Sequence, residues 1–302
     1  MPKLDLSIIT ISFNTREILT DCIKSVIKHT KGISYEIIVV ENDSKDGSLE
    51  RIRELEKQFP EVKLVDAKAN IGFGRANNLG AKNARGEYLL LLNSDTLVYD
   101  NAIKESLDAI KKIPKCGVFS CKLLNADKSV QASGGSFPTF GNVFAWQFFV
   151  DDLPLVGKLI PSFHPQLGSY NRNREMDWIT GAFMIISKNV FDKAGGFDEN
   201  IFMYTEEMEL CYRLKKLGYK TVYHITPAII HLGGASGGSV FALTSEIKNM
   251  IYFWKKHKPG WQLPFIKLFF FSGSLLRLLI FGIIKGDEKA RRAYTQALGL
   301  IF

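Results

Sequence analysis

The sequence predicts an α/β fold in which a mostly parallel central sheet is flanked by helices. The first observation is the leucine run at residues 89–92, which has no polar alternation and is typical of a strand buried on both faces. The second is that strand-like and helix-like segments alternate from the N-terminus to residue 121. Such alternation predicts parallel strands joined by right-handed crossovers. The third is an apolar, basic C-terminal segment, which predicts a separate helical part.

Each expected element has its own pattern. Strands are predicted where β-branched and apolar residues cluster, at residues 6–13, 35–40, 62–65, 89–92, 117–121, 178–186 and 221–224, with an extended segment at 227–232. Helices are predicted from apolar residues at helical spacing within 18–27, 49–59, 102–110 and 206–217, with another helix ending at residue 84. We expect Asn14 or Thr15 to cap the first helix and Thr205 to cap the last. Residues 123–176 have little periodicity and are interpreted as a substrate-facing insertion that sets acceptor specificity.

The positive charge of the chain is concentrated near its C-terminus. Residues 248–292 hold ten Lys or Arg and two acids, Asp287 and Glu288, which gives +8, whereas the remainder has 29 basic and 29 acidic residues and is neutral. This localisation disfavours a nucleic-acid footprint, so no nucleic-acid partner is expected. We therefore predict a main domain at residues 1–247 and a basic helical segment at 248–302. The four cysteines lack CxxC spacing and no signal peptide is evident, which fits a reducing compartment.

Polar residues end the leucine strand at Asn93, Ser94 and Asp95. Ligands of open α/β sheets bind outside the carboxyl ends of the strands, so Asp95 lies where such a fold places its chemistry. A carboxylate after a small polar residue suits a divalent metal ion that holds a phosphate. The alternative is that these residues form only a turn, which all three residue types favour.

Three further polar clusters follow strands or open helices. The carboxylate of Glu41 follows the second strand and is placed to accept hydrogen bonds from a nucleotide, although a solvated turn is the alternative. Residues 70–74 form a glycine-containing loop before Arg75, which favours anions, but the spacing is not GxGxxG. Glu206, Glu207 and Glu209 lie in the first turn of a helix, where one of them is predicted to be a general base and stabilisation by the helix dipole is the alternative.

Taken together and in this order, the clusters resemble those of family 2 glycosyltransferases. The resemblance is carried by ISFN at residues 11–14, VENDSKDGS at 40–48, NIGFGRANN at 70–78, LNSD at 92–95, and GFDE at 196–199 followed by Glu206 and Glu207. It covers residues 4–235 and is greatest to the rhamnosyltransferase-like branch of bacterial polysaccharide assembly. It implies a GT-A fold and an inverting transfer from a nucleotide diphosphate sugar.

The resemblance also implies roles for individual residues. Phe13 and Glu41 would line the nucleotide pocket, with Glu41 standing where the family more often has Asp. Arg75 would lie near the donor phosphates. The implied nucleotide-sugar-binding set is completed by Asp43, Asn93 and Ser94.

The implied catalytic machinery is a metal site and a base. Asp95 ends the family's DxD-type motif, and because Asn93 replaces its first acid, Asp95 alone supplies the charge. His231 matches a histidine that in some relatives helps to hold metal or diphosphate, and a structural histidine is the alternative. The implied cofactor is Mg²⁺ or Mn²⁺, a Lewis acid toward the leaving diphosphate. Glu207 stands at the family's catalytic Asp, with Glu206 as the other candidate for the proton acceptor.

We expect dTDP-rhamnose or a UDP-hexose as donor and a polyprenyl-diphosphate-linked saccharide as acceptor, in cell-surface polysaccharide synthesis. An inactive nucleotide-sugar-binding or scaffold protein of the same fold is the alternative, because Asn93 and Glu207 depart from the family pattern. It would bind donor without turnover. A nucleotidyltransferase is disfavoured because residues 13–16 are not the Gly-rich basic loop expected after the first strand of such enzymes.

The C-terminal segment is predicted to associate with a membrane. Residues 262–284 are mainly apolar, with a narrow polar stripe formed by Lys267, Ser274, Lys285 and, to one side, Arg277. Because charges interrupt this segment, we predict an interfacial helix instead of a spanning one. The protein would be peripheral on the cytoplasmic face of the plasma membrane, with its basic residues near anionic lipid. The alternative is a helix packed on the catalytic domain or on a second subunit, as in a homodimer.

Overall fold

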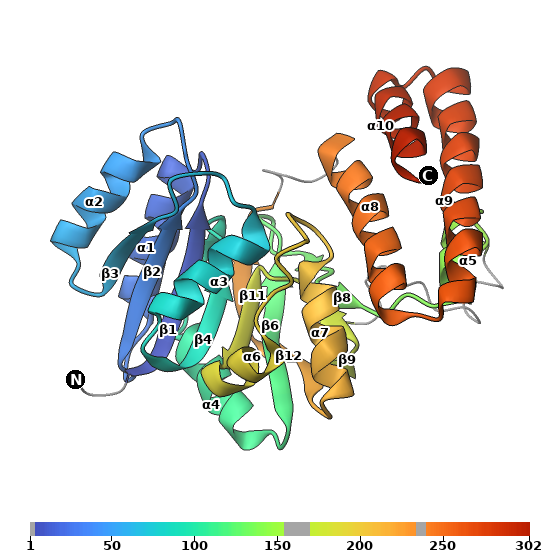
Figure 1. The fold of residues 1–302 in the computed structure, drawn as a ribbon. Coiled ribbons are helices and arrows are strands. Elements are labelled where there is room, and N and C mark those ends of the chain that lie inside the picture. The colour runs from blue at the N-terminus through green and yellow to red at the C-terminus, as the bar shows by residue number, and fades with distance from the viewer. Residues whose placement is uncertain (1–3, 154–169, 234–239) are drawn as a thin grey trace. The chain divides into compact units, whose positions relative to one another are not determined.

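The computed structural model describes residues 4–153, 170–233 and 240–302, which belong to two compact units (Figure 1). Unit 1 comprises residues 1–134 and 167–232, and unit 2 comprises 135–166 and 233–302. The units therefore differ from the division predicted at residue 247, which falls inside one helix of unit 2. Part of the predicted insertion also belongs to unit 2, and its residues 154–169 lie outside the described part of the chain.

Unit 1 is built on the predicted mostly parallel sheet, with strand order β3-β2-β1-β4-β11-β6-β12-β5. These strands are β1 (Leu4–Ser12), β2 (Tyr35–Glu41), β3 (Val62–Asp66), β4 (Gly86–Leu92), β5 (Thr96–Leu97), β6 (Cys116–Leu124), β11 (Phe183–Ser187) and β12 (Lys220–His231). The first four are parallel, as are β6 and β12. β11 runs antiparallel to β4 and β6, and β5 antiparallel to β12.

Helices cover both faces of this sheet (Figure 1). They are α1 (Arg16–His29), α2 (Ser48–Gln58), α3 (Phe73–Asn83), α4 (Ala102–Lys112), α6 (Lys188–Ala194) and α7 (Glu206–Lys216). Ile8 of β1 lies in the core formed with α1, α2 and α4, whereas its neighbour Ile9 faces α3. A Cβ at Gly80 of α3 would lie 2.5 Å from Ile9, so this helix approaches the sheet only with glycine there. Residues 89–92 are buried between β1 and β11, as their sequence predicts.

Several local predictions are wrong in detail. Thr15 and Thr205 occupy the N-cap positions of α1 and α7, but neither side chain accepts a hydrogen bond from a backbone N–H of its helix. At the start of α1, the backbone N–H of Arg16 donates to the Asp46 carboxylate instead. The strand expected at 178–186 is interrupted at Gly181, because its two halves join different sheets. They are β10 (Trp178–Ile179), which pairs with β8 (Gly134–Gly135), and β11. The insertion also supplies β7 (Val130–Gln131), β9 (Arg174–Met176) and α5 (Phe140–Gln147).

Unit 2 is helical. It contains α5, α8 (Val240–His257), α9 (Leu263–Arg277) and α10 (Glu288–Leu300), with a 3₁₀ turn (Gly260–Gln262) before α9 and a π-helical segment (Leu278–Ile284) after it. α10 packs on α8 and α9, and α5 packs on α9. By length and composition, Gly260–Ile284 is the one helical run among the described residues that could cross a membrane, a test that core helices of soluble proteins also pass.

The polar stripe predicted on the surface of this helix turns partly inward. Ser274 and Arg277 are buried, and the Arg277 guanidinium donates to the carbonyl oxygens of Trp146 and Gln147 and lies 4.2 Å from the ring centroid of Phe149. The helix instead presents large apolar side chains to solvent. We call this set the exposed apolar face; it consists of Trp261, Phe265, Leu268, Leu275, Leu279 and Ile283.

Candidate active site

The polar clusters predicted separately from the sequence are joined by hydrogen bonds. Asn14, which follows β1, accepts a 2.7 Å bond from the backbone N–H of Lys45 in the loop after β2. Asn42 in the same loop donates to Asn70 at 3.0 Å and accepts from the backbone N–H of Ile71 at 3.0 Å. Because each bond links two loops, the segments after β1, β2 and β3 form one surface.

The glycine loop before α3 is joined in turn to the segment before α7. The backbone N–H of Phe73 donates to the carbonyl oxygen of Phe202 at 2.9 Å. Gly72 has φ 84°, and a Cβ there would lie 2.3 Å from the same oxygen, so only glycine fits. Arg75 uses its Nε to donate to the Glu199 carbonyl at 2.7 Å, and within the described part of the chain its terminal nitrogens form no hydrogen bond. Its role at the donor phosphates stays a prediction.

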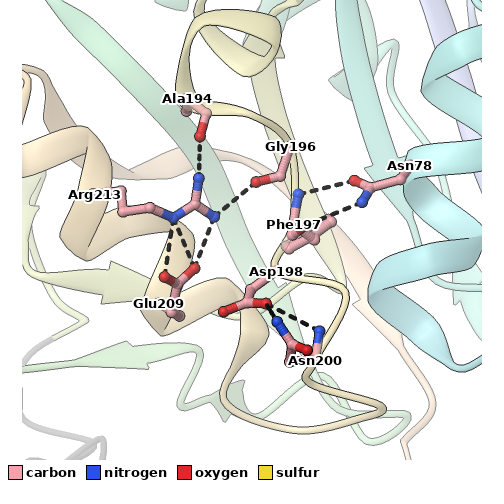
Figure 2. Close-up of polar contacts among 8 residues, drawn as sticks. All are labelled: Asn78, Ala194, Gly196, Phe197, Asp198, Asn200, Glu209 and Arg213. Atoms are coloured by element: carbon pink, nitrogen blue, oxygen red, sulfur yellow. Dashed lines mark hydrogen bonds and ion pairs between the residues drawn. The ribbon is translucent and has the colours of Figure 1, made fainter. Parts of the chain in front are cut away.

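Arg213 of α7 holds the loop that contains the GFDE motif (Figure 2). Its guanidinium pairs with the fully buried Glu209 at 2.7 Å and donates to the carbonyl oxygens of Ala194 and Gly196. One cation thereby neutralises a buried carboxylate and satisfies two backbone acceptors. These contacts hold α7, the helix that contains Glu207, against the end of α6.

Asn78 of α3 holds the same loop from the other side (Figure 2). Its amide accepts from the backbone N–H of Phe197 at 2.8 Å and donates to the Phe197 carbonyl at 2.9 Å, so both backbone polar groups of one residue are paired with one side chain. The next turn is closed by Asp198, which accepts two bonds from Asn200. The GFDE motif is therefore held as a fixed structural element between α3 and α7.

The structure brings together the residues predicted to hold a metal ion. Asp95 Oδ1 and His231 Nε2 are 3.2 Å apart, and Asn93 Nδ2 is 3.4 Å from the same nitrogen. The pairing of β5 with β12 sets this geometry, since it places Thr96 opposite His231, and the Leu232 N–H donates to the Asp95 carbonyl. The Asp95 and His231 side chains keep 14% and 15% of their surface exposed, whereas Ser94 is buried.

This pair fits a divalent cation that is shared with a bound phosphate. A carboxylate oxygen and an imidazole nitrogen converge, and both atoms are of kinds that Mg²⁺ or Mn²⁺ accepts as ligands. Among the described residues, no group of three or more His, Cys, Asp and Glu side chains could hold a metal ion alone. The remaining ligands would therefore come from a substrate or from water, as is usual for Mg²⁺.

The two candidate bases differ in their environments. Glu206 is buried, and its Oε2 has no hydrogen-bond partner among the described residues; burial and the neighbouring charge of Glu207 raise the pKa of Glu206 well above its ordinary value. Glu207 is partly exposed and its Oε1 accepts a 3.0 Å bond from the backbone N–H of Gly181. Burial also raises the pKa of Glu207, and the Gly181 bond opposes that shift. The Gly181 bond therefore favours the charged form of Glu207, whereas the described residues offer no such donor to Glu206 Oε2.

Residues 180–182, which the sequence did not single out, connect the Asn93–Asp95 loop to Glu207. While Gly181 donates to Glu207, the Ala182 carbonyl accepts from the backbone N–H of Asn93 at 3.1 Å. A Cβ at Gly181 would lie 3.0 Å from the Phe73 ring and 3.3 Å from Glu207 Cγ, so a larger residue would displace both. The Thr-Gly pair inside an apparent strand is the signal that could have revealed this turn.

The residues predicted to bind the nucleotide differ in how accessible their side chains are. Phe13 is 45% exposed and offers a ring surface at the end of β1. Glu41 is buried, and its two carboxylate oxygens accept from the backbone N–H groups of Asp43 and Ser44. Asp43 pairs with Lys45 at 2.6 Å. Glu41 therefore shapes the turn after β2, and Phe13 is the more accessible of the two residues expected to line the pocket.

Comparisons with known proteins define the class. A family model described as glycosyl transferase family 2 matches residues 7–193. The chain is 26% identical over 250 residues to N-acetylglucosaminyl-diphospho-decaprenol L-rhamnosyltransferase of Mycobacterium tuberculosis, covering 76% of this chain and 77% of that protein. It is 23% identical over 238 residues to rhamnosyltransferase WbbL of Escherichia coli K12, covering 74% and 83%.

A solved structure agrees with this assignment at the level of the fold. Mannosyltransferase PcManGT from Pyrobaculum calidifontis, in complex with GDP-Man and Mn²⁺, matches with a TM-score of 0.60 at 14% identity, covering 100% of this chain and 86% of that one. The protein is a glycosyltransferase, and it belongs to glycosyl transferase family 2. The predicted family, its rhamnosyltransferase-like character and the GT-A fold are confirmed.

Replacement of Arg213 by Met should destabilise the protein by about 3–5 kcal/mol, because it leaves the buried Glu209 without its guanidinium partner. Urea unfolding at neutral pH measures this. The double variant Glu209→Met/Arg213→Met should recover part of the loss, since the buried charge is also gone. Lys188→Met is a matched control: Lys188 forms a surface ion pair of the same helical spacing with Asp192, and its loss should cost about 0–1 kcal/mol. Equal losses of stability at Arg213 and Lys188 would contradict the role of Arg213 as the partner of a buried carboxylate.

Proposed function

We propose that the protein transfers a sugar, with inversion, from a nucleotide diphosphate sugar to a saccharide acceptor. The observation that carries the proposal is the Gly181–Ala182 peptide segment, which contacts Glu207 on one side and the Asn93–Asp95 loop on the other. This arrangement supports the proposal, because the proposed proton acceptor and the candidate phosphate-binding site would lie at one edge of the sheet. A single displacement requires these two elements together.

Asp95 and His231 would hold Mg²⁺ or Mn²⁺, which would supply Lewis-acid stabilisation of the leaving diphosphate. The Asp95 carboxylate gives this site its negative charge, while the exposed ring of Phe13 offers a surface for the nucleotide base. Arg75 would add positive charge for the donor phosphates through its terminal nitrogens. Mn²⁺ in the Pyrobaculum calidifontis structure supports the choice of a divalent ion.

Glu207 is the better candidate for the base. It is partly exposed, so an acceptor hydroxyl can reach it, whereas Glu206 is buried. The raised pKa of Glu207 brings its basicity closer to the operating pH, which favours proton transfer in the transition state. The Gly181 N–H fixes one carboxylate oxygen and leaves the other to accept the proton as the acceptor oxygen attacks the anomeric carbon. Because the attack is direct, no covalent sugar–enzyme intermediate is required.

The relatives suggest the class of substrate. The Mycobacterium tuberculosis protein is named for transfer of L-rhamnose to an N-acetylglucosaminyl-diphospho-decaprenol. We infer that this chain uses dTDP-rhamnose or a UDP-hexose and a polyprenyl-diphosphate-linked saccharide, in cell-surface polysaccharide synthesis. An acceptor of that kind is held at a membrane surface, so the enzyme has to work beside lipid.

Unit 2 is suited to that surface, and we propose that it binds the cytoplasmic face of the plasma membrane peripherally. Leu268, Leu275 and Leu279 of the exposed apolar face lie at helical spacing and each is about half exposed. Residues 248–292 carry the whole net charge of +8, which favours anionic lipid. Arg277 does not oppose insertion of this face because its charge is turned inward.

Glu207→Gln should lower kcat by about 10²–10⁴-fold, because it removes the proton acceptor, while donor affinity is retained. Glu206→Gln is the matched control and should have a small effect, since Glu206 is buried, so that an acceptor hydroxyl does not reach it, and the amide preserves its shape. The wild-type rate should fall as the pH drops through the raised pKa of Glu207. Steady-state kinetics and donor titration measure these effects. If Glu206→Gln loses turnover and Glu207→Gln does not, the base is assigned to the wrong residue.

The triple variant Leu268→Ser/Leu275→Ser/Leu279→Ser should stop sedimenting with vesicles that contain phosphatidylglycerol, because the apolar contact is removed. Leu217→Ser is the control, since it changes an equally exposed leucine of unit 1 and should leave sedimentation unchanged. High salt should release the wild type only in part, because charge supplies only part of the binding. Wild-type protein that stays free of vesicles and forms a dimer, which the triple variant dissociates, would show a subunit interface instead.

A further inference from the structure

His231 has a partner on the side of its ring that faces away from Asp95. Its Nδ1 lies 2.6 Å from Oε1 of Gln131, a residue of β7 in the insertion. Neither the sequence motifs nor the mechanism above assigns a role to Gln131. In a neutral histidine one ring nitrogen carries a proton, and only the other can bind a metal ion. A hydrogen bond with Gln131 therefore matters because it decides which nitrogen carries the proton.

The direction of this hydrogen bond follows from a chain of contacts that ends at a carboxylate. Asp127 is an acceptor, so the Ser129 hydroxyl must donate to it at 2.5 Å. The Ser129 oxygen is then the acceptor for Asn125 Nδ2 at 2.9 Å, and Asn125 Oδ1 accepts from Gln131 Nε2 at 2.8 Å. Gln131 Nε2 also lies 3.4 Å from the carbonyl oxygen of His231. Each amide orientation is assigned by its network, and the result places Gln131 Oε1 toward His231.

Gln131 Oε1 can only accept, so His231 Nδ1 carries the hydrogen. In the neutral ring, Nε2 then presents a lone pair, and this lone pair faces Asp95 Oδ1 at 3.2 Å. Two acceptors at that distance repel each other unless a cation or a proton lies between them. Asn93 Nδ2 lies 3.4 Å from Nε2 and can donate one hydrogen bond to that nitrogen. The site is thus arranged in advance for a positive ion.

We propose that Gln131 is a positioning residue that fixes the His231 tautomer with Nε2 available to bind a divalent cation. The proposal rests on the metal site of the proposed function and adds the residue that orients its nitrogen ligand. Ligating histidines commonly donate their second ring N–H to an oxygen acceptor, and loss of such a partner typically lowers metal affinity by about 10–100-fold.

The tautomer can be measured in the metal-free protein. The chain has five histidines, so ¹⁵N-histidine labelling gives a small set of ring signals, and His231→Gln identifies those of His231. At a pH at which its ring is neutral, wild-type His231 should be protonated at Nδ1. Gln131→Met should shift the proton to Nε2, which can then donate to Asp95, whereas Gln131→Glu should keep it at Nδ1. A wild-type ring protonated at Nε2, or no shift in Gln131→Met, would overturn the proposal.

Binding of Mn²⁺ in the presence of dTDP, followed by the electron paramagnetic resonance signal of free Mn²⁺, tests the consequence. Gln131→Met should weaken binding by about 10–100-fold and Gln131→Glu should restore it. Gln58→Met changes an exposed glutamine at the end of α2 and should have no effect. Equal affinity of wild type and Gln131→Met would overturn the role of Gln131 and leave the proposed function standing. Wild-type protein that does not bind Mn²⁺ would overturn both the metal site and the role of Gln131 in it.

Discussion

The candidate active site depends on three successive residues, 180–182, that interrupt what the sequence suggests is one strand. The Thr180 N–H donates to the Ser133 carbonyl, the Gly181 N–H to Glu207, and the Ala182 carbonyl accepts from Asn93. These bonds link the insertion, the helix that carries the predicted base Glu207 and the loop that carries Asn93 and Asp95. Without this segment, the three would be separate features of one sheet edge.

Close approach of backbone segments explains why small residues recur around this edge. At Gly181, a side chain would meet both Phe73 and Glu207, and at Gly72 it would meet the carbonyl oxygen of Phe202. Protein interiors have little room to absorb such displacements. The glycines that look in the sequence like a loose anion-binding loop therefore also allow the loops after β3 and before α7 to touch. A side chain in place of either glycine would therefore change the spacing of the backbone segments around the site.

Much of this arrangement could be predicted from the sequence because it depends on local patterns. The buried strand at 89–92 and the polar residues at its end follow from composition along the chain, and the parallel topology then brings the strand ends to one edge. The break at Gly181, the internal use of the Glu41 carboxylate and the inward turn of Arg277 could not be predicted, since each depends on a distant partner. A polar residue near a site has the same appearance in the sequence whether it faces a ligand or holds a turn.

The central claim is that Asp95, His231 and Glu207 form one metal-assisted sugar-transfer site. Release of nucleoside diphosphate from a panel of UDP-, GDP- and dTDP-sugars, with a saccharide acceptor and with or without EDTA, tests it most directly. The account predicts release from dTDP-rhamnose or a UDP-hexose, loss of release in EDTA, and recovery with Mn²⁺ or Mg²⁺. Undiminished release in EDTA would contradict the metal site, and donor binding without release from any sugar would contradict catalysis altogether.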